Sequence, residues 1–224
     1  MVRSLLSDLN ELPQRDFEVI VTINIEEEMQ DYSGCNFALQ VIRNSAPKGF
    51  GANHNAAFAL SRGEFFVVVN PDIRTPDLRL AELQRAFYDA CTGACAPLVY
   101  NSEGGLEESA RRFPTFGRLL RRALLRERSP DYLWSGEPRP VDWVAGMFVV
   151  FRRKAFEEVG GFDSQRFFMY YEDVDLCERL QRHGWAIRVQ PSTRVVHDAQ
   201  RASHRNLRHL RWHITSALRY LTGL

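Results

Sequence analysis

Short runs rich in β-branched and aromatic residues alternate along this chain with segments in which apolar residues recur at helical spacing. The runs predict strands over residues 17–24, 37–43, 64–69, 94–100, 144–151 and 188–196. The helical pattern covers residues 2–12, 52–61, 78–90, 116–128, 172–183 and 203–221. Strands that alternate with helices usually form a sheet covered by helices on both faces. We therefore expect an α/β fold with a mostly parallel sheet, in which the run 64–69 is buried on both faces.

The length of 224 residues suits a single domain, and 45% apolar with 25% charged residues is an ordinary globular composition. The longest apolar run, residues 143–151, is too short to span a bilayer, and the N-terminus lacks the pattern of a signal peptide. The four cysteines form no CxxC pair, which favours reduced thiols over a zinc ribbon or a disulfide framework. These features predict a cytoplasmic protein.

The net charge of +1 conceals two basic segments. Residues 111–128 contain seven arginines and one acid, and residues 199–224 contain five arginines and no acid. Arginine predominates, because only Lys48 and Lys154 of the 29 basic residues are lysine. The guanidinium fork suits phosphate groups, so a phosphate-bearing partner and a merely solvated helix face are the two interpretations. Nucleic acid is not expected, because no nucleic-acid-binding module is recognisable.

A carboxylate follows the most apolar predicted strand. Residues 65–69 read Phe-Phe-Val-Val-Val and lead directly into Asn-Pro-Asp, so that Pro71 ends the strand and Asp72 is held at the rim of the sheet. Ligands of open α/β sheets bind beyond the carboxyl ends of the strands, and a carboxylate there suits Mg²⁺ or Mn²⁺ that bridges to phosphates. A turn-forming aspartate is the alternative.

A glycine-rich segment between a predicted strand and a predicted helix begins at Gly49 and reads Gly-Phe-Gly-Ala-Asn-His-Asn. Glycines allow close approach of the backbone to a ligand, and a helix N-terminus attracts anions. The segment matches neither a Walker loop nor the GxGxxG pattern, so a tight turn is the alternative.

Three acids, Glu172, Asp173 and Asp175, follow five aromatic or apolar residues at the start of a predicted helix. The helix dipole favours carboxylates there, and capping by one acid is the simplest interpretation. The aromatic neighbours, however, would raise the pKa of a carboxylate, as a general base requires. We therefore expect a catalytic role for this cluster. His197 ends the last extended segment and is by itself equally compatible with a structural role.

Six segments in this order resemble glycosyltransferase family 2, and within it a rhamnosyltransferase-like branch that builds bacterial surface polysaccharides. They are GFGANHN (49–55), VVVNPD (67–72), SARRFPT (109–115), VAGMFVVFRRKAFEEVGGFD (144–163), FFMYYEDVDLCERLQRHG (167–184) and VVH (195–197). The resemblance covers about residues 14–224. Each segment alone is modest, but six in register are highly specific.

The resemblance implies a single GT-A domain over residues 1–224. Within it, residues 1–100 form the donor-nucleotide half, 101–198 the acceptor and catalytic half, and 199–224 a basic amphipathic C-terminal helix. The implied reaction is inverting transfer of a sugar, with rhamnose as the candidate, from a nucleotide-diphosphate sugar. The implied acceptor is a glycan or a polyprenyl-diphosphate-linked sugar.

The same resemblance assigns roles to individual residues. Asp173 would be the general base, and Glu172 would help to place the acceptor. Asp72 would hold a divalent metal, Mg²⁺ or Mn²⁺, and His197 matches a position that contacts the metal or the diphosphate. The substrate-binding positions would be Asn24, Gly49, Asn55 and Gly146.

Two features depart from the family pattern. The chain begins at what looks like the helix that follows the family's first strand, so that either the chain is truncated or the sheet lacks that strand. The family's Asp-Asn-x-Ser-like turn reads Ile23-Asn24-Ile25-Glu26 here, and only Asn24 carries over.

Two predicted helices, 116–128 and 203–221, combine leucines with arginines. In the second helix the apolar face consists of Leu207, Leu210, Ile214, Ala217, Leu218 and Leu221. Basic amphipathic helices bind anionic membranes, whereas packing in the core explains the leucines equally well. We expect peripheral association with the inner face of the plasma membrane.

Two other functions are compatible with these residues. One is a catalytically inactive GT-A-like scaffold that binds a nucleotide, a glycan or a partner enzyme, which Ile23 and the missing strand favour. The other is a metal-dependent phosphohydrolase, which would require Asp72, Asp173 and Asp175 to converge on a metal and a phosphate.

Overall fold

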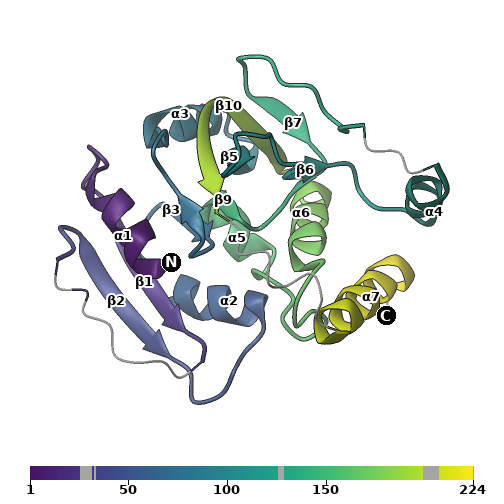
Figure 1. The fold of residues 1–224 in the computed structure, drawn as a ribbon, viewed down its shortest axis with the longest axis horizontal. Coiled ribbons are helices and arrows are strands. Elements are labelled where there is room, and N and C mark those ends of the chain that lie inside the picture. The colour runs from purple at the N-terminus through teal and green to yellow at the C-terminus, as the bar shows by residue number, and fades with distance from the viewer. Residues whose placement is uncertain (26–31, 33, 126–128, 199–206, 224) are drawn as a thin grey trace.

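The computed structural model of this chain describes residues 1–25, 32, 34–125, 129–198 and 207–223. The N-terminal elements lie at one side of the molecule, and two helices, α4 (Phe116–Leu125) and α7 (Leu207–Thr222), lie at the opposite side (Figure 1). All the site residues expected from the sequence fall within the described ranges.

The N-terminal segment contains two helices and a small sheet of two strands that is separate from the larger sheet. Its elements are α1 (Val2–Asn10), β1 (Glu18–Ile23), β2 (Ala38–Arg43) and α2 (Phe50–Leu60). The two strands are parallel, and Leu6 of α1 belongs to the same apolar cluster as Val21 and Ile23 of β1. Within the described residues this pair has no hydrogen-bonded neighbour in the larger sheet. This separation agrees with the expectation of a missing strand.

The larger sheet lies between the N-terminal elements and the two basic helices, and it has the strand order β3-β9-β5-β10-β4, with β7 pairing to β10. Its strands are β3 (Phe65–Val69), β4 (Ile73–Arg74), β5 (Thr92–Asn101), β7 (Arg139–Val141), β9 (Phe148–Arg152) and β10 (Ala186–His197). Two short strands, β6 (Ala110–Arg111) and β8 (Trp143–Val144), form a separate antiparallel pair.

The larger sheet is mixed, which corrects the expectation of a mostly parallel one. β5 and β10 are parallel, but β9 runs antiparallel to both β3 and β5. Neighbouring strands that are parallel need a crossover connection. The long segment between β5 and β9 instead leads back into the sheet in the opposite direction. The expectation of a doubly buried strand at 64–69 is also wrong, because β3 is an edge strand and Val67 is 39% exposed.

Helices cover both faces of the larger sheet. Those not yet given are α3 (Leu80–Arg85), the 3-10 turn η1 (Ala86–Tyr88), α5 (Arg153–Glu158) and α6 (Glu172–Arg182). Phe156 of α5 and Leu176 of α6 belong to one apolar core, and Leu83 of α3 and Phe87 of η1 belong to the other. The expected arrangement of a sheet between helical layers is therefore confirmed.

The two basic helices turn their leucines outward. In α7, Leu210, Ile214 and Leu218 are 56%, 51% and 53% exposed, and in α4 Leu120 and Leu124 are 61% and 72% exposed. Core packing, one of the two explanations for these leucines, is therefore wrong. α7 packs on the protein through His209, Trp212, Ser216 and Tyr220. Residues 126–128 and 203–206 of the predicted helices lie outside the described residues, as does the environment of the Leu207 side chain.

None of the helices in the described part of the chain is both long and apolar enough to cross a membrane. All four cysteines are free, as expected, and Cys95 and Cys177 are buried.

Candidate active site

Asp72 lies in the turn that follows β3, at the rim of the larger sheet. The N–H of Asn70 donates to the carbonyl of Met147 (2.9 Å), and the carbonyl of Asp72 accepts from the N–H of Asp198 (2.8 Å). β4 then pairs with the end of β10, where His197 is the last residue. The turn is thus held from both sides, and the strand register brings Asp72 next to His197.

His197 lies between two carboxylates. Its Nε2 is 3.3 Å from Oδ2 of Asp72, and its Nδ1 is 3.0 Å from Oε2 of Glu107. The hydrogen bonds to Asp72 and to Glu107 raise the pKa of His197 to about 9. The structure brings together Asp72 and His197, as the family resemblance implied. Glu107 was missed, because it lies between strands in a segment without a motif.

Asp72 retains an acceptor atom that the described protein does not use. Its Oδ1 is buried and has no hydrogen-bond partner among the described residues. Carboxylate oxygens suit Mg²⁺ and Mn²⁺, and a neutral imidazole is a further ligand for a transition metal. No group of three or more His, Cys, Asp or Glu side chains in the described ranges is arranged to hold a metal ion. Asp72, together with His197 once a bound cation has displaced its proton, therefore fits a cation whose other ligands are phosphate oxygens and water.

The second pair of acids stands at the start of α6, as expected from the sequence. Glu172 is the first residue of the helix, is 5% exposed, and its Oε2 has no hydrogen-bond partner among the described residues. Asp173 accepts two backbone hydrogen bonds, from the N–H of Gly146 to Oδ2 (3.1 Å) and from the N–H of Val174 to Oδ1 (2.9 Å).

Burial raises the pKa values of both carboxyl groups, and the neighbouring charge of Asp173 raises that of Glu172 further. The backbone N–H groups of Gly146 and Val174 oppose the effect at Asp173. A carboxylate with a raised pKa takes a proton more readily than an exposed one does. The pair is therefore suited to proton transfer.

Two consecutive tyrosines before this pair have left-handed backbone, with φ of 71° at Tyr170 and 67° at Tyr171. This conformation costs a non-glycine residue of order 1–3 kcal/mol and is common at functional sites. α7 secures the loop, because the hydroxyl of Tyr170 hydrogen-bonds Nδ1 of His209 (2.9 Å) and the hydroxyl of Ser216 donates to the carbonyl of Met169 (2.8 Å). Sequence reasoning missed this strain, since aromatic residues rarely adopt it.

Two glycines allow chain segments to approach Asp173 and the loop before it. A Cβ atom on Gly146 would lie 3.1 Å from the ring of Phe50 and 3.8 Å from Cβ of Asp173. A Cβ atom on Gly49 would overlap the carbonyl oxygen of Phe168. Gly146 thus touches the candidate base, and Gly49 touches the loop that leads to it.

Asn24 and Asn55 use their side-chain amides to hold the backbone. Asn24 donates to the carbonyl of Lys48 (3.0 Å) and accepts from its N–H (2.8 Å). Asn55 makes the same pair of bonds with Phe162, at 2.8 and 2.9 Å. The observed role of each amide is to join two segments, and contact with a sugar donor stays a prediction.

Asp175 does not join the other acids. Its carboxylate is 3.2 Å from Arg166 and 2.8 Å from Arg179, and the residue is 5% exposed. A phosphohydrolase site would need Asp175 to converge with Asp72 and Asp173. Because Asp175 is already held in a buried ion-pair network, the geometry does not favour that alternative.

The turn between β8 and β9 connects the two pairs of functional residues. Gly146 donates to Asp173, and the next residue, Met147, accepts from Asn70, two positions before Asp72. The candidate base and the candidate metal ligand are thus both anchored to one short stretch of backbone.

A cavity of about 310 Å³ opens beside the base. It is bordered by Glu172 and Asp173 of α6, by Tyr170 and Tyr171 of the preceding loop, and by His213 of α7. Arginines of β6, of the residue after it and of α4 also line it. Its volume is at the lower end of the range for small-molecule sites, so a sugar-sized group is a suitable occupant.

Residues 16–215 match the family described as "Glycosyltransferase like family 2". The chain is 37% identical over 153 residues to the N-acetylglucosaminyl-diphospho-decaprenol L-rhamnosyltransferase of Mycobacterium tuberculosis, which covers 64% of this chain and 50% of that protein. The chain thus spans about half the length of that relative. Rhamnosyltransferase WbbL of Escherichia coli K12 is 29% identical over 245 aligned positions, covering 98% of this chain and 87% of that protein.

A solved structure shows the same fold. The mannosyltransferase PcManGT from Pyrobaculum calidifontis, in complex with GDP-Man and Mn²⁺, superposes with a TM-score of 0.60 at 19% identity, covering 98% of this chain and 61% of that one. The fold is accordingly that of the GT-A glycosyltransferases. With the family match extending over residues 16–215, this chain belongs to glycosyltransferase-like family 2.

Proposed function

We propose that this chain is an inverting glycosyltransferase that moves a sugar from a nucleotide-diphosphate sugar to an acceptor hydroxyl. The observation that carries this proposal is the buried Glu172–Asp173 pair, which borders a cavity and is joined through one turn to the Asp72–His197 pair. One pair suits proton transfer and the other suits a cation on a diphosphate, and the proposed reaction uses both.

In the reaction, the carboxylate of Asp173 accepts the proton of the acceptor hydroxyl while that oxygen forms a bond to the anomeric carbon. The bond from this carbon to the donor diphosphate breaks, and its electron pair leaves with the nucleoside diphosphate. Attack from the face opposite the leaving group inverts the anomeric configuration. Mg²⁺ or Mn²⁺ on Asp72 and His197 would supply charge stabilisation for the leaving diphosphate.

The remaining residues support binding and position. When Glu172 is protonated, it donates a hydrogen bond to an acceptor hydroxyl. When it is ionised, it accepts a hydrogen bond from that hydroxyl. Residues 1–100 act as the donor half, 101–198 as the acceptor half, and 199–224 as an amphipathic segment. The substrate-binding positions in this proposal are Asn24, Gly49, Asn55 and Gly146.

The names of two relatives support a finer assignment. Both are rhamnosyltransferases, and one name includes a diphospho-decaprenol acceptor. We therefore assign rhamnose as the sugar and a glycan or a polyprenyl-diphosphate-linked sugar as the acceptor. Synthesis of bacterial surface polysaccharide is the process that this reaction would serve.

The exposed leucines of α4 and α7 support peripheral association of this cytoplasmic chain with the inner face of the plasma membrane. Both helices border the cavity beside Asp173, and both carry arginines among the leucines. Apolar side chains flanked by arginines suit an anionic lipid surface. Replacing Leu120 and Leu124 by glutamate should weaken sedimentation with phosphatidylglycerol vesicles. Unchanged binding of this variant would refute the contact.

Donor binding is tested by thermal shift with UDP, dTDP, GDP and ADP, each with and without Mn²⁺. We expect one nucleotide to stabilise the wild type only with metal, and Asp72→Ala to lose that effect. No stabilisation by any nucleotide would instead favour the inactive scaffold, for which Ile23 is the supporting observation. That residue is 6% exposed in the cluster beneath α1, where the family pattern has an aspartate.

A further inference from the structure

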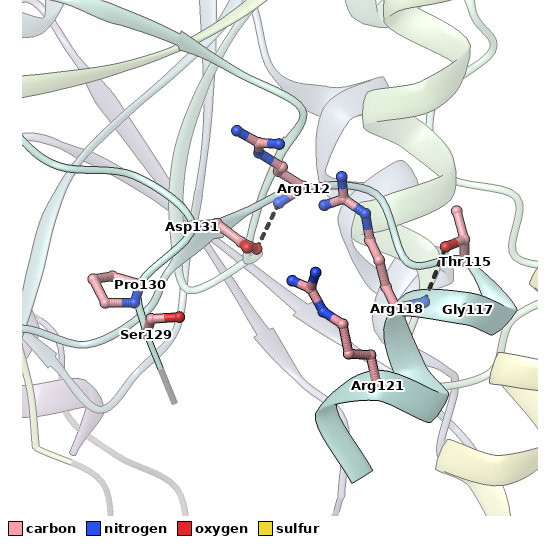
Figure 2. Close-up of a pocket in the computed structure, with 8 residues that line it drawn as sticks. All are labelled: Arg112, Thr115, Gly117, Arg118, Arg121, Ser129, Pro130 and Asp131. Carbon is pink, nitrogen blue, oxygen red and sulfur yellow. Dashed lines mark hydrogen bonds between the residues drawn. The ribbon is translucent and has the colours of Figure 1, made fainter. Parts of the chain in front are cut away.

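An arginine-lined pocket of about 530 Å³ lies against the N-terminal half of α4. Figure 2 shows Arg112, Arg118 and Arg121 placed around this hollow, with Asp131 on its other side. Gly117 also lines it, so the start of the helix is reached without an intervening side chain. We call this hollow the arginine pocket.

Positive charge in the arginine pocket is only partly balanced. Arg111 and Arg122, which lie beside it, both pair with Glu108, and Arg122 is also 3.4 Å from Asp131. The guanidinium groups of Arg112 and Arg118, in contrast, have no carboxylate within 4 Å in the part of the chain that is described. Asp131 is the only acid among the described lining residues.

Asp131 has a structural role, and its carboxylate does not pair with the guanidinium groups of Arg112 and Arg118. Its Oδ2 accepts a hydrogen bond from the backbone N–H of Arg112 (3.0 Å) and pairs with Arg122. The carboxylate thus holds the backbone of Arg112, while the guanidinium of this residue, which lines the pocket, extends away from Asp131 (Figure 2). At the helix start, Thr115 caps α4 by accepting from the N–H of Arg118 (3.2 Å), and the helix dipole adds to the positive potential.

The arginine pocket adjoins the cavity that holds the base. Arg112, Arg118, Arg121 and Asp131 line both hollows, and the second one is also lined by Asp173 and its neighbours. A ligand that places a hydroxyl at Asp173 therefore extends toward these arginines. The donor diphosphate is assigned elsewhere, at Asp72 and His197.

We propose that Arg112 and Arg118, with Arg121, bind a diphosphate group carried by the acceptor. The inference rests on the proposed glycosyl transfer and adds which part of the acceptor is recognised and by which residues. The guanidinium groups of Arg112 and Arg118, which have no carboxylate within 4 Å among the described residues, together match a dianion better than a single carboxylate, and the planar forks of arginines match phosphate oxygens. The acceptor is then a sugar diphosphate ester whose hydroxyl lies at Asp173 while its diphosphate lies in the arginine pocket.

The first test measures binding of inorganic pyrophosphate by calorimetry in EDTA at low salt, where a metal-dependent donor site does not contribute. Arg118→Gln and the double variant Arg112→Gln/Arg118→Gln should weaken binding by roughly tenfold for each arginine removed. Arg3→Gln, which removes an equal charge from an exposed position on α1, is the matched control and should bind as the wild type does. Equal binding by the double variant and the control would overturn the proposal.

The second test compares two acceptors with the same sugar, a short-chain prenyl-diphosphate glycoside and an alkyl glycoside without phosphate. Arg118→Gln should raise KM for the diphosphate acceptor about tenfold with little change in kcat, and should leave the alkyl glycoside unaffected. An equal rise for both acceptors would show a general packing role and overturn the proposal. If the wild type glycosylates neither acceptor, the proposed function fails, while the pyrophosphate titration still decides the binding site.

A third arm separates the acceptor from a lipid headgroup. Phosphatidylglycerol vesicles are titrated with the wild type and with the double variant. If the variant loses vesicle binding but keeps its affinity for soluble pyrophosphate, the arginines contact a membrane surface and the assignment to the acceptor is wrong. Loss of pyrophosphate binding with vesicle binding retained is the expected result.

Discussion

Asp72 and Asp173 are the same residue type, one in the turn after a strand and the other in the first turn of a helix, and their surroundings differ. Asp72 faces His197, whose pKa is raised to about 9, and has an unused oxygen. Asp173 faces Glu172 and backbone N–H groups, and burial raises its pKa. The first environment favours positive charge and the second favours a proton. Two carboxylates thus acquire different chemistry from their neighbours alone.

The largest effect should come from the base. Asp173→Asn keeps the acceptor oxygen for the N–H of Gly146 but removes the proton-accepting carboxylate, so kcat should fall by about 10²–10⁴-fold. Steady-state transfer assays measure this, with circular dichroism to confirm folding. A variant within fivefold of the wild type would remove the distinction between the two aspartates.

Asp72→Asn tests the other side of the comparison and should act through the cation. We expect Mn²⁺-dependent nucleotide binding to weaken by roughly tenfold or more, since one charged ligand is lost. The pKa of His197 should also fall from about 9, because Asp72 is the largest cause of its rise. Calorimetry and an NMR titration of the histidines measure the two effects. An unchanged histidine titration would contradict the ion pair.

Asn55→Ala should lower stability, in addition to any effect on donor binding. The change leaves both backbone groups of Phe162 without their observed partner, which costs about 2–3 kcal/mol. Urea unfolding measures the loss, and the KM for the donor is the control. A large rise in that KM would support the donor-contact role that the family resemblance implied, and unchanged stability would contradict the structural role of the Phe162 hydrogen bonds.

The smallest effect concerns pH and Glu172. Burial and the neighbouring charge of Asp173 raise the folded-state pKa of Glu172 from its ordinary value near 4.5 to about 8, so its ionisation favours the unfolded chain. The protonation of Glu172 therefore contributes to the free energy of unfolding fully below about pH 4.5, and this contribution is lost as the pH rises toward 8. Glu172→Gln should raise the Tm by a few degrees at pH 8.5 and leave it unchanged at pH 4. A lower Tm of the variant at pH 8.5 would show that ionised Glu172 stabilises the folded chain and would contradict this prediction.

Features with a local cause were predictable from the sequence. Pro71 ends a strand before Asp72, and the acids at 172–173 follow an aromatic segment at a helix start, so both positions were found. Features that depend on distant segments were not. Glu107 reaches His197 across 90 positions, and the left-handed tyrosines depend on contacts from α7.

The spacing of apolar residues identified the apolar faces of the elements, but not whether those faces pack on the protein or contact solvent. The spacing of Leu210, Ile214 and Leu218 marks one face of a helix, and the structure turns that face to solvent while an aromatic and polar side packs on the protein. The run at 65–69 had the composition of a buried strand, but its position in the sheet is set by the strands that pair with it. β9, which comes about eighty positions later, leaves it at an edge.

The anchoring of Met169 by Ser216 also has a consequence for synthesis of the chain on the ribosome. The two residues are 47 positions apart, a delay on the order of 2–10 s at typical elongation rates. During that time the segment with the base has emerged without the helix that holds its strained tyrosines. The nascent chain should therefore acquire its sheet before its proton acceptor is in place, and activity would appear only when α7 has been translated and has docked.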